Sequence, residues 1–432
     1  MNGSRLKAER FLERVGLDAE SVDVERMLDD FHAEMEAGLA GKPSSLAMIP
    51  TYLSADVEVP ADKPVIALDA GGTHLRIALV SFDTKGCPII EDITRHPMPG
   101  SEGPVSREEF YDRFVLYLQP FAAQAERVGF CFSYPAEISP DCDGRLLTWS
   151  KEIQAPQVVG DFIGANIFGR LSHLGYALKY TLLNDTVAAL LAGRAASKAH
   201  FGASYVGFIL GTGTNTAYLE KNRNIIKRRD LGPEGSQAVN VESGNFDKAP
   251  RTLIDERLDI TTNNPGAYSF EKMISGAYLG SLSRAVLAAA AEQTLFSREG
   301  SASILSLKGL TTADLGGFLS PPQGGILFAG AAMKEADREI ASHLIRAVIA
   351  RAALFAAVNI AAAVLKSGAG DSREGPACVN IDGSTFYKTP GLQPQTEGHL
   401  RKILTSRGVS AELVQIEDSP LIGAAVAGLT RA

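Results

Sequence analysis

The sequence contains few cysteines and histidines, and their spacing gives little support to a structural zinc site. Its 432 residues include four cysteines and seven histidines, with no C-x-x-C pair and no H-x-x-x-H pair. A structural zinc site usually needs such paired ligands. We therefore expect reduced, mostly buried thiols, as in proteins of a reducing compartment.

Long apolar runs and an excess of positive charge are also lacking. The most apolar stretch, residues 352–365, carries Asn359 and is shorter than a membrane span requires. The N-terminus is charged from the start, so we expect no secretory signal and a cytoplasmic location. The 42 basic and 50 acidic residues give a net charge of −8, which argues against binding nucleic acid or membranes over the whole surface.

The length and the order of apolar patterns predict two α/β domains. A 432-residue chain is too long for one ordinary core. Apolar periodicity predicts helices over 22–41, 108–125 and 348–365, and a short closing helix, IGAAVAGLTRA. Two strand–glycine–strand units, with DAGGT at 69–73 and GTGTN at 211–215, open two successive halves. Paired halves of this kind suit a ligand held across a cleft.

The two glycine turns are candidate phosphate-binding loops. Glycine lets backbone N–H groups approach phosphate oxygens closely, and a threonine adds a hydroxyl. Neither turn fits the Walker pattern or the G-x-G-x-x-G fingerprint, and each alone is also compatible with a tight hairpin. Asp69 follows the buried strand Val65–Leu68, where it could hold Mg²⁺ through water or could simply cap the turn.

Polar side chains also gather where a strand becomes a helix, at Asn184, Asp185 and Thr186. All three residue types cap helices well, so helix capping is the simpler interpretation. One cap needs one such residue, however, and the others remain available for a ligand. An aspartate near a cleft could accept the proton of a substrate hydroxyl during phosphoryl transfer.

Eight ordered segments resemble the hexokinase family, along nearly the whole chain. They are DFHAEMEAGLAGKPSSLAMIPTY, ALDAGGTHLRIALV, FSYPAEI with the later TWSK, LLNDTVAAL, GFILGTGTNTAYLE, VNVESGNF, NNPGAYSFEKMISGAYLG and VNIDGSTF. The resemblance implies an ATP-dependent hexokinase that phosphorylates the 6-hydroxyl of glucose, and also of mannose or fructose. It further implies ATP and Mg²⁺ as cofactors, a role in glycolysis, and a monomer or homodimer.

The resemblance also implies roles for single residues. Asp185 would be the general base, and Lys151 would neutralise the transferring phosphoryl group. The implied sugar-binding residues are Ser133, Ser150, Lys151, Asn184, Asp185, Asn215, Glu242 and Glu271. The implied nucleotide-binding residues are Asp69, Gly71, Gly72, Thr73, Arg76, Gly211, Thr212, Gly213, Gly383 and Ser384, with Asp69 orienting Mg²⁺ through water.

The implied fold is α/β, the two-lobed hexokinase fold of actin-like ATPases (ribonuclease H-like), with a small and a large domain around a central cleft. We expect a small domain at 64–184 plus 420–432, and a large domain at 1–63 plus 185–419. Asp185 would then lie at the hinge, and sugar binding would close the cleft.

Some positions depart from the family pattern. His74 replaces the usual Asn, Ser243 stands where relatives often have Trp, and Ala277 where several have Lys. The sequence lacks the family's usual T-x-L-G-L nucleotide-binding segment, and residues 319–325 stand roughly in its place. Three rivals remain: a ROK-type sugar kinase, whose cysteine-rich zinc segment is missing here; a catalytically silent sugar sensor; and another actin-like ATPase, which would not explain the NDTV and FEKMISG segments.

Overall fold

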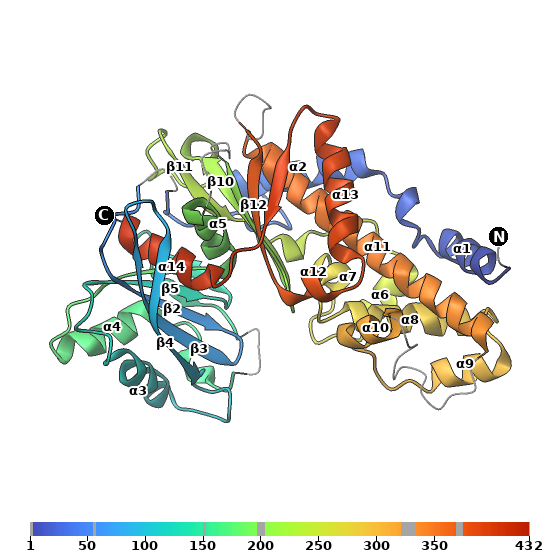
Figure 1. Cartoon of the computed structure of the whole chain (residues 1–432), viewed down its shortest axis with the longest axis horizontal. Helices are drawn as coiled ribbons and strands as arrows, with labels where there is room; N and C mark the ends of the chain where they lie inside the picture. The colour runs from blue at the N-terminus through green and yellow to red at the C-terminus, as the bar shows by residue number, and fades with distance from the viewer. Residues whose placement is uncertain are drawn as a thin grey trace.

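Two β-sheets, each with its own helices, form two lobes in the computed structural model (Figure 1). The structure describes residues 3–54, 58–149, 153–196, 204–320, 334–368 and 375–431. The predicted sugar-site residues Ser150 and Lys151 therefore lie outside the described residues, as does most of the 319–325 segment.

The smaller lobe is built on a mixed five-stranded sheet in the order β4-β3-β2-β5-β8. Strands β2, β3 and β4 are antiparallel neighbours, whereas β5 runs parallel to both β2 and β8. Their bounds are β2 Val65–Gly71, β3 His74–Phe82, β4 Pro88–Pro97, β5 Arg127–Phe132 and β8 Lys179–Leu183. A separate hairpin joins β6 (Ala136–Ile138) to β7 (Gly144–Leu146).

Residues of β2 alternate between the two faces of this sheet, as the period of two in a strand requires. Ile66 and Leu68 share a core with α3 (Arg107–Leu118) and α4 (Ile163–His173). Val65 and Ala67 share a different core with α5 (Asp185–Ala196) and α14 (Ser419–Thr430). Helices therefore cover both faces, which explains why β2 reads as a continuous apolar run.

The C-terminal helix α14 lies unusually close to its neighbours. A Cβ on Gly129 of β5 would lie 1.7 Å from the carbonyl oxygen of Ala424, and one on Gly423 would lie 1.9 Å from that of Ala188 in α5. Glycine at both contacts lets the backbones touch, so the last helix of the chain packs on the small sheet. The exact domain boundaries, 64–184 plus 420–432 against the remainder, stay a prediction.

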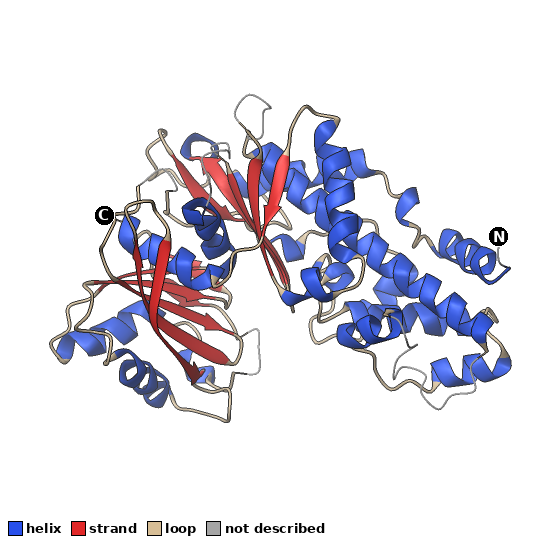
Figure 2. Ribbon diagram, in the orientation of Figure 1, coloured by secondary structure: helices blue, strands red, loops and turns tan. Residues whose placement is uncertain are grey.

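The larger lobe holds a six-stranded sheet in the order β1-β11-β10-β9-β12-β13 (Figure 2). The bounds are β1 Ile49–Pro50, β9 Tyr205–Leu210, β10 Thr214–Lys221, β11 Ser236–Asn240, β12 Ala377–Asp382 and β13 Ala411–Val414. Val206 and Phe208 share a core with the long helix α11 (Glu335–Lys366). On the opposite face Ala217 and Ala238 share a core with α5. Helix α5 thus lies between the two sheets.

The remaining helices belong to the α11 side of the large lobe. They are α1 Gly3–Val15, α2 Val24–Leu39, α6 Leu253–Asp259, α7 Glu271–Ile274, α8 Leu279–Glu292, α9 Arg298–Leu305, α10 Thr312–Leu319, α12 Ser384–Lys388 and α13 Leu392–Thr405. Short 3₁₀ turns occur at Ala19–Ser21 (η1), Pro156–Val158 (η2), Asn222–Asn224 (η3) and Ser243–Asn245 (η4).

The predicted elements mostly match, with two corrections. The helix expected over 108–125 ends at Leu118, two residues before Pro120, because proline has no backbone N–H with which to continue the helical hydrogen bonds. Helix α11 is much longer than the expected 348–365 and is long and apolar enough to span a membrane, but 89% of its most apolar window is buried within the protein. Its apolarity is that of a core helix.

Candidate active site

The first glycine turn joins β2 to β3 in the small lobe and leaves a hydroxyl exposed. Gly72 has a φ of +68°, which glycine adopts without a Cβ clash. The Tyr134 hydroxyl donates a hydrogen bond to the Gly72 carbonyl oxygen, and this bond fixes the turn. Thr73 is exposed beyond it, with Oγ1 3.0 Å from Nδ1 of His74. The turn can therefore present N–H groups and a hydroxyl to an anion.

Asp69 lies just before this turn and is held by Arg76 of the adjacent strand. Nε and Nη2 of Arg76 lie 2.9 and 2.8 Å from Oδ2 of Asp69, and Nη1 lies 2.6 Å from Oδ1 of Asp418. Burial raises the pKa of the Asp69 carboxyl and Arg76 opposes that shift, while Asp185 and Asp382 add to it. Arg76, predicted to bind nucleotide, is thus paired with two carboxylates here.

The second glycine turn joins β9 to β10 in the large lobe and meets the segment predicted to hold adenosine. Gly211 accepts hydrogen bonds at its carbonyl oxygen from the Gly276 N–H at 2.9 Å and the Thr385 hydroxyl at 2.8 Å. Gly383, with a φ of +123°, lies so close that a Cβ there would be 2.4 Å from the Leu210 carbonyl. Thr212 is exposed at the tip. The structure therefore brings Gly383 and Ser384 beside this turn.

The expected general base begins helix α5, directly after β8. The Thr186 N–H donates to Oδ1 of Asn184 and to Oδ1 of Asp185, both at 2.9 Å. Helix capping therefore accounts for part of this cluster, as the simpler interpretation held. Asp185 is half-buried, and its carboxylate raises the pKa of Asp69, Asp382 and Glu242, although burial is the larger cause in each case. Asp185 thus lies among carboxylates of both lobes.

Asn240 joins two predicted sugar-binding residues of the large lobe, Asn215 and Glu242, into one hydrogen-bonded row. Nδ2 of Asn215 donates to Oδ1 of Asn240 at 2.7 Å, and Nδ2 of Asn240 donates to Oε1 of Glu242 at 2.8 Å. Glu271, at the start of α7, accepts from the Thr214 N–H at 3.0 Å. Burial, with Glu242 nearby, raises the pKa of Glu271 to about 7. Alternating donors and acceptors of this kind match the hydroxyls of a polyol.

A small pocket lies at the joint between the lobes and contains part of this row. Asn184, Asn240 and Glu242 line it together with Thr51, Tyr134 and apolar side chains of the small lobe. Ser133 lies instead by the first turn, where a Cβ on Gly71 would be 3.7 Å from its Oγ. The pocket joins Asn184 and Glu242, and Ser133 lies between two residues of its wall, Phe132 and Tyr134.

Sequence reasoning missed five residues of this region: Thr51, Tyr134, Asn240, Asp382 and Asp418. Four of them stand inside or next to segments already singled out, namely MIPTY, FSYPAEI, VNVESGNF and VNIDGSTF. Asp418, just before the closing helix, carried no local signal because its partner Arg76 is 342 positions away in the sequence.

Asp69, Asp185 and Asp382 form a donor set that suits Mg²⁺ held through water. Burial, and to a smaller extent the Asp185 carboxylate, raises the pKa of both Asp69 and Asp382, so a nearby cation would stabilise the ionised forms of these two groups. Among the described residues, no group of three or more His, Cys, Asp or Glu side chains is placed to hold a metal ion directly. A magnesium ion usually keeps several of its waters and needs few direct protein ligands.

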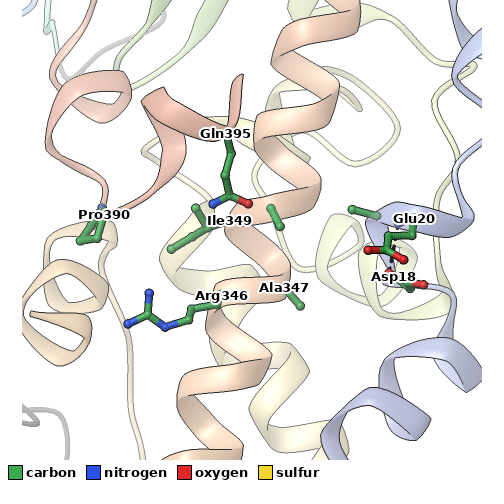
Figure 3. Close-up of a pocket in the computed structure, with 9 residues that line it drawn as sticks. Asp18, Glu20, Arg346, Ala347, Ile349, Pro390 and Gln395 are labelled. Carbon is green, nitrogen blue, oxygen red and sulfur yellow. Dashed lines mark hydrogen bonds between the residues drawn. The ribbon is translucent and has the colours of Figure 1, made fainter. Parts of the chain in front are cut away.

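A second pocket lies away from these residues, on the α11 side of the large lobe (Figure 3). Asp18 and Glu20 approach it from η1, Arg346 and Ile349 from α11, and Gln395 from α13. It contains none of the predicted site residues, so the candidate site remains the joint between the lobes.

Two α/β lobes, each opened by a strand–glycine–strand unit, with carboxylates and amides at their joint, define a two-lobed sugar-kinase fold. Sequence models described as hexokinase match residues 7–195 and 205–430. The chain therefore belongs to the hexokinase family, a family of ATP-dependent hexose kinases.

Individual relatives agree with this assignment. The chain is 28% identical over 427 residues to Hexokinase-1 of Schizosaccharomyces pombe, covering 93% of this chain and 86% of the relative. It is 34% identical over 297 residues to Hexokinase-2 of Oryza sativa subsp. japonica, covering 63% of this chain and 58% of that relative. A glucose complex of Schistosoma mansoni hexokinase has a TM-score of 0.78 at 23% identity and covers 99% of both chains. The predicted family and fold are confirmed.

Proposed function

We propose that this protein transfers the γ-phosphoryl group of Mg-ATP to the 6-hydroxyl of glucose, with mannose and fructose as further acceptors. The observation that carries the proposal is the position of Asp185. In addition to the larger effect of burial, the Asp185 carboxylate raises the pKa of Asp69 and Asp382 on the phosphate side and of Glu242 on the polyol side. A base at that position can reach a sugar hydroxyl while the glycine turns hold the nucleotide.

In the proposed reaction Asp185 accepts the 6-hydroxyl proton as the sugar oxygen bonds to the γ-phosphorus. The bond from that phosphorus to the β,γ-bridging oxygen breaks, and ADP leaves with the electron pair. When bound, Mg²⁺ supplies charge neutralisation for the phosphates, and Asp69 and Asp382 would hold it through water. Thr73, Thr212 and the turn N–H groups would hold the phosphate oxygens in place.

The sugar would be oriented by the row of amides and carboxylates. Asn184, Asn215 and Glu242 offer donors and acceptors to its hydroxyls, and Glu271 adds an acceptor next to the second turn. Closure of the lobes around the sugar would exclude water, which otherwise competes as a nucleophile. We further propose that the reaction takes place in the cytoplasm, where its product would enter glycolysis.

A coupled assay of glucose 6-phosphate formation with Mg-ATP tests the proposal, run beside mannose, fructose and N-acetylglucosamine. We expect turnover with glucose at about 1 s⁻¹ or above, the low end of usual enzyme rates. Glucose binding without turnover of any of these sugars would instead support a catalytically silent sugar sensor.

Binding is measurable independently of turnover, because the sequence contains a single tryptophan. Trp149 packs edge-on against Tyr134, which lines the pocket, with ring centroids 4.9 Å apart. Its fluorescence should therefore change when a sugar occupies the pocket, and a titration gives a dissociation constant.

A further inference from the structure

A closed ring of three buried polar side chains lies directly beneath the sugar-binding row. Thr216 of β10, Ser243 of η4 and Asn359 of α11 are each at most 2% exposed. Oγ1 of Thr216 lies 3.0 Å from Oδ1 of Asn359 and 3.1 Å from Oγ of Ser243. Nδ2 of Asn359 lies 3.0 Å from Oγ of Ser243. Three elements far apart in the sequence meet at this ring.

The orientation of the Asn359 amide sets the direction of every hydrogen bond in the ring. Oδ1 of Asn359 can only accept, so the single hydroxyl proton of Thr216 points to it. Nδ2 of Asn359 can only donate, so Oγ of Ser243 accepts from it. The Ser243 proton must then point to Oγ1 of Thr216. With the Asn359 amide in this orientation, each of the three side chains therefore both donates and accepts within the ring.

The ring is connected to the sugar-binding row through two backbone groups. The N–H groups of Thr216 and Ser243 donate to the same atom, Oδ1 of Asn215, at 2.7 and 3.2 Å. Two donors on Oδ1 turn Nδ2 of Asn215 towards Asn240, which in turn holds Glu242. The position of the ring therefore decides which way the Asn215 amide faces.

Glu242 needs such support because its backbone is strained. It has a φ of 59° and a ψ of 46°, a left-handed conformation in which a Cβ approaches the backbone carbonyl oxygen too closely. Ser243, the next residue, is held at its N–H by Asn215 and at its hydroxyl by the ring. Anchoring Ser243 on both sides keeps Glu242 aimed at the pocket.

We propose that Thr216, Ser243 and Asn359 are positioning residues that set the orientation of Asn215 and Glu242 for the sugar, and so contribute to sugar affinity and selectivity. The proposal rests on the proposed function, because it concerns the same sugar site. None of the three residues needs to touch the sugar. The ring ties the site to α11, the central helix of the large lobe.

Thr216→Val tests the proposal, because valine keeps the shape of threonine and removes the hydroxyl. We expect the glucose dissociation constant, read from Trp149 fluorescence, and the KM for glucose to rise roughly tenfold, which corresponds to about 1.4 kcal/mol. The KM for ATP should change less than about twofold, because the hydrogen bonds of the three ring side chains do not reach either glycine turn. Thr216→Ser retains the hydroxyl and should restore the parent's affinity.

Thr396→Val is the matched control. Thr396 is also a fully buried threonine, but its hydroxyl bonds to the Leu392 carbonyl oxygen within α13. It should lower the thermal unfolding midpoint without changing glucose affinity. Asn359→Leu should weaken glucose binding as Thr216→Val does. If either of those variants fails to fold, Ser243→Ala provides the same test with the smallest change in side-chain volume.

Folded Thr216→Val or Ser243→Ala protein with the parent's glucose affinity would overturn the proposal. So would a rise in the KM for ATP equal to the rise for glucose, which would indicate general loss of structure. The parent is measured in the same series. If the parent protein binds no sugar, the proposed function itself is overturned. If the parent binds sugar and the folded ring variants bind it equally tightly, only the proposed role of the ring is overturned.

Discussion

Arg76 joins Asp69 and Asp418, two carboxylates almost 350 positions apart in the sequence, at distances of 2.8 and 2.6 Å. Asp69 belongs to the small sheet and Asp418 stands at the N-terminus of α14. The ion pairs therefore tie the first phosphate turn to the closing helix.

The two pairs should differ in their contribution to stability. Arg76→Ala leaves Asp69 buried without its partner, so we expect the free energy of unfolding to fall by about 1–3 kcal/mol. We also expect the KM for ATP to rise. Asp418→Asn keeps the Arg76–Asp69 pair and should cost under about 1 kcal/mol. Urea unfolding measures both.

Arg113→Ala, which breaks an exposed pair with Glu109 on α3, is the control and should cost under about 0.5 kcal/mol. An Asp418→Asn variant as unstable as Arg76→Ala would show that Asp418 stabilises the protein by some other contact.

Removal of the proposed base should separate catalysis from binding. For Asp185→Ala we expect kcat to fall by roughly 10²–10⁴-fold, the usual contribution of a general base, while the glucose dissociation constant rises much less. Single-turnover kinetics and Trp149 fluorescence measure the two effects. A kcat within about threefold of the parent would place the base elsewhere.

Glu271 should make stability and sugar binding depend on pH. Burial raises its pKa from 4.5 to about 7. Between pH 4.5 and pH 7, the carboxyl is therefore mostly protonated in the folded state and mostly ionised in the unfolded state. This group therefore destabilises the protein progressively as pH rises from about 4.5 to 7. Glu271→Gln should flatten that part of the profile in thermal unfolding at pH 5, 6 and 7.5.

Glucose affinity should show the opposite trend. A sugar hydroxyl that donates to the Glu271 carboxylate favours its ionised form, so affinity should rise as pH passes through about 7. Calorimetric titrations in buffers of different ionisation enthalpy should show proton release on binding. Proton release that persists in Glu271→Gln would assign it to another group.

Gly129 should be intolerant of a side chain. Its Cβ would lie 1.7 Å from the carbonyl oxygen of Ala424, and a helix backbone cannot move aside cheaply. We expect Gly129→Ala to lower the free energy of unfolding by about 1–3 kcal/mol or more. Gly169→Ala in α4 has open space around its Cβ and should be neutral or stabilising.

Sugar binding should bring the lobes together. The pocket at their joint is lined by side chains from both sheets, so a ligand that contacts both favours a closed arrangement. Small-angle scattering should show a smaller radius of gyration with glucose than without it. An unchanged radius would count against closure.

Local sequence determined the elements that carry the site. The apolar strand Val65–Leu68 and the glycines after Asp69 predict a strand and a tight turn, because strand burial and positive φ are local properties. The change from strand to helix at Asn184 was likewise readable from the residues around it. Eight motifs in order were enough to predict the family and its fold.

Tertiary structure decided which of these residues meet. Arg76 pairs with Asp418, and Asn359 bonds to Thr216 across 143 positions, because a hydrogen bond depends on distance in space and leaves no periodic signal in the chain. The strain at Glu242 and the raised pKa of Glu271 likewise come from burial and neighbours that only the packed fold supplies. The sequence thus determined the chemical groups of this protein, and the packing of α11 and α14 against the sheets decided their orientation.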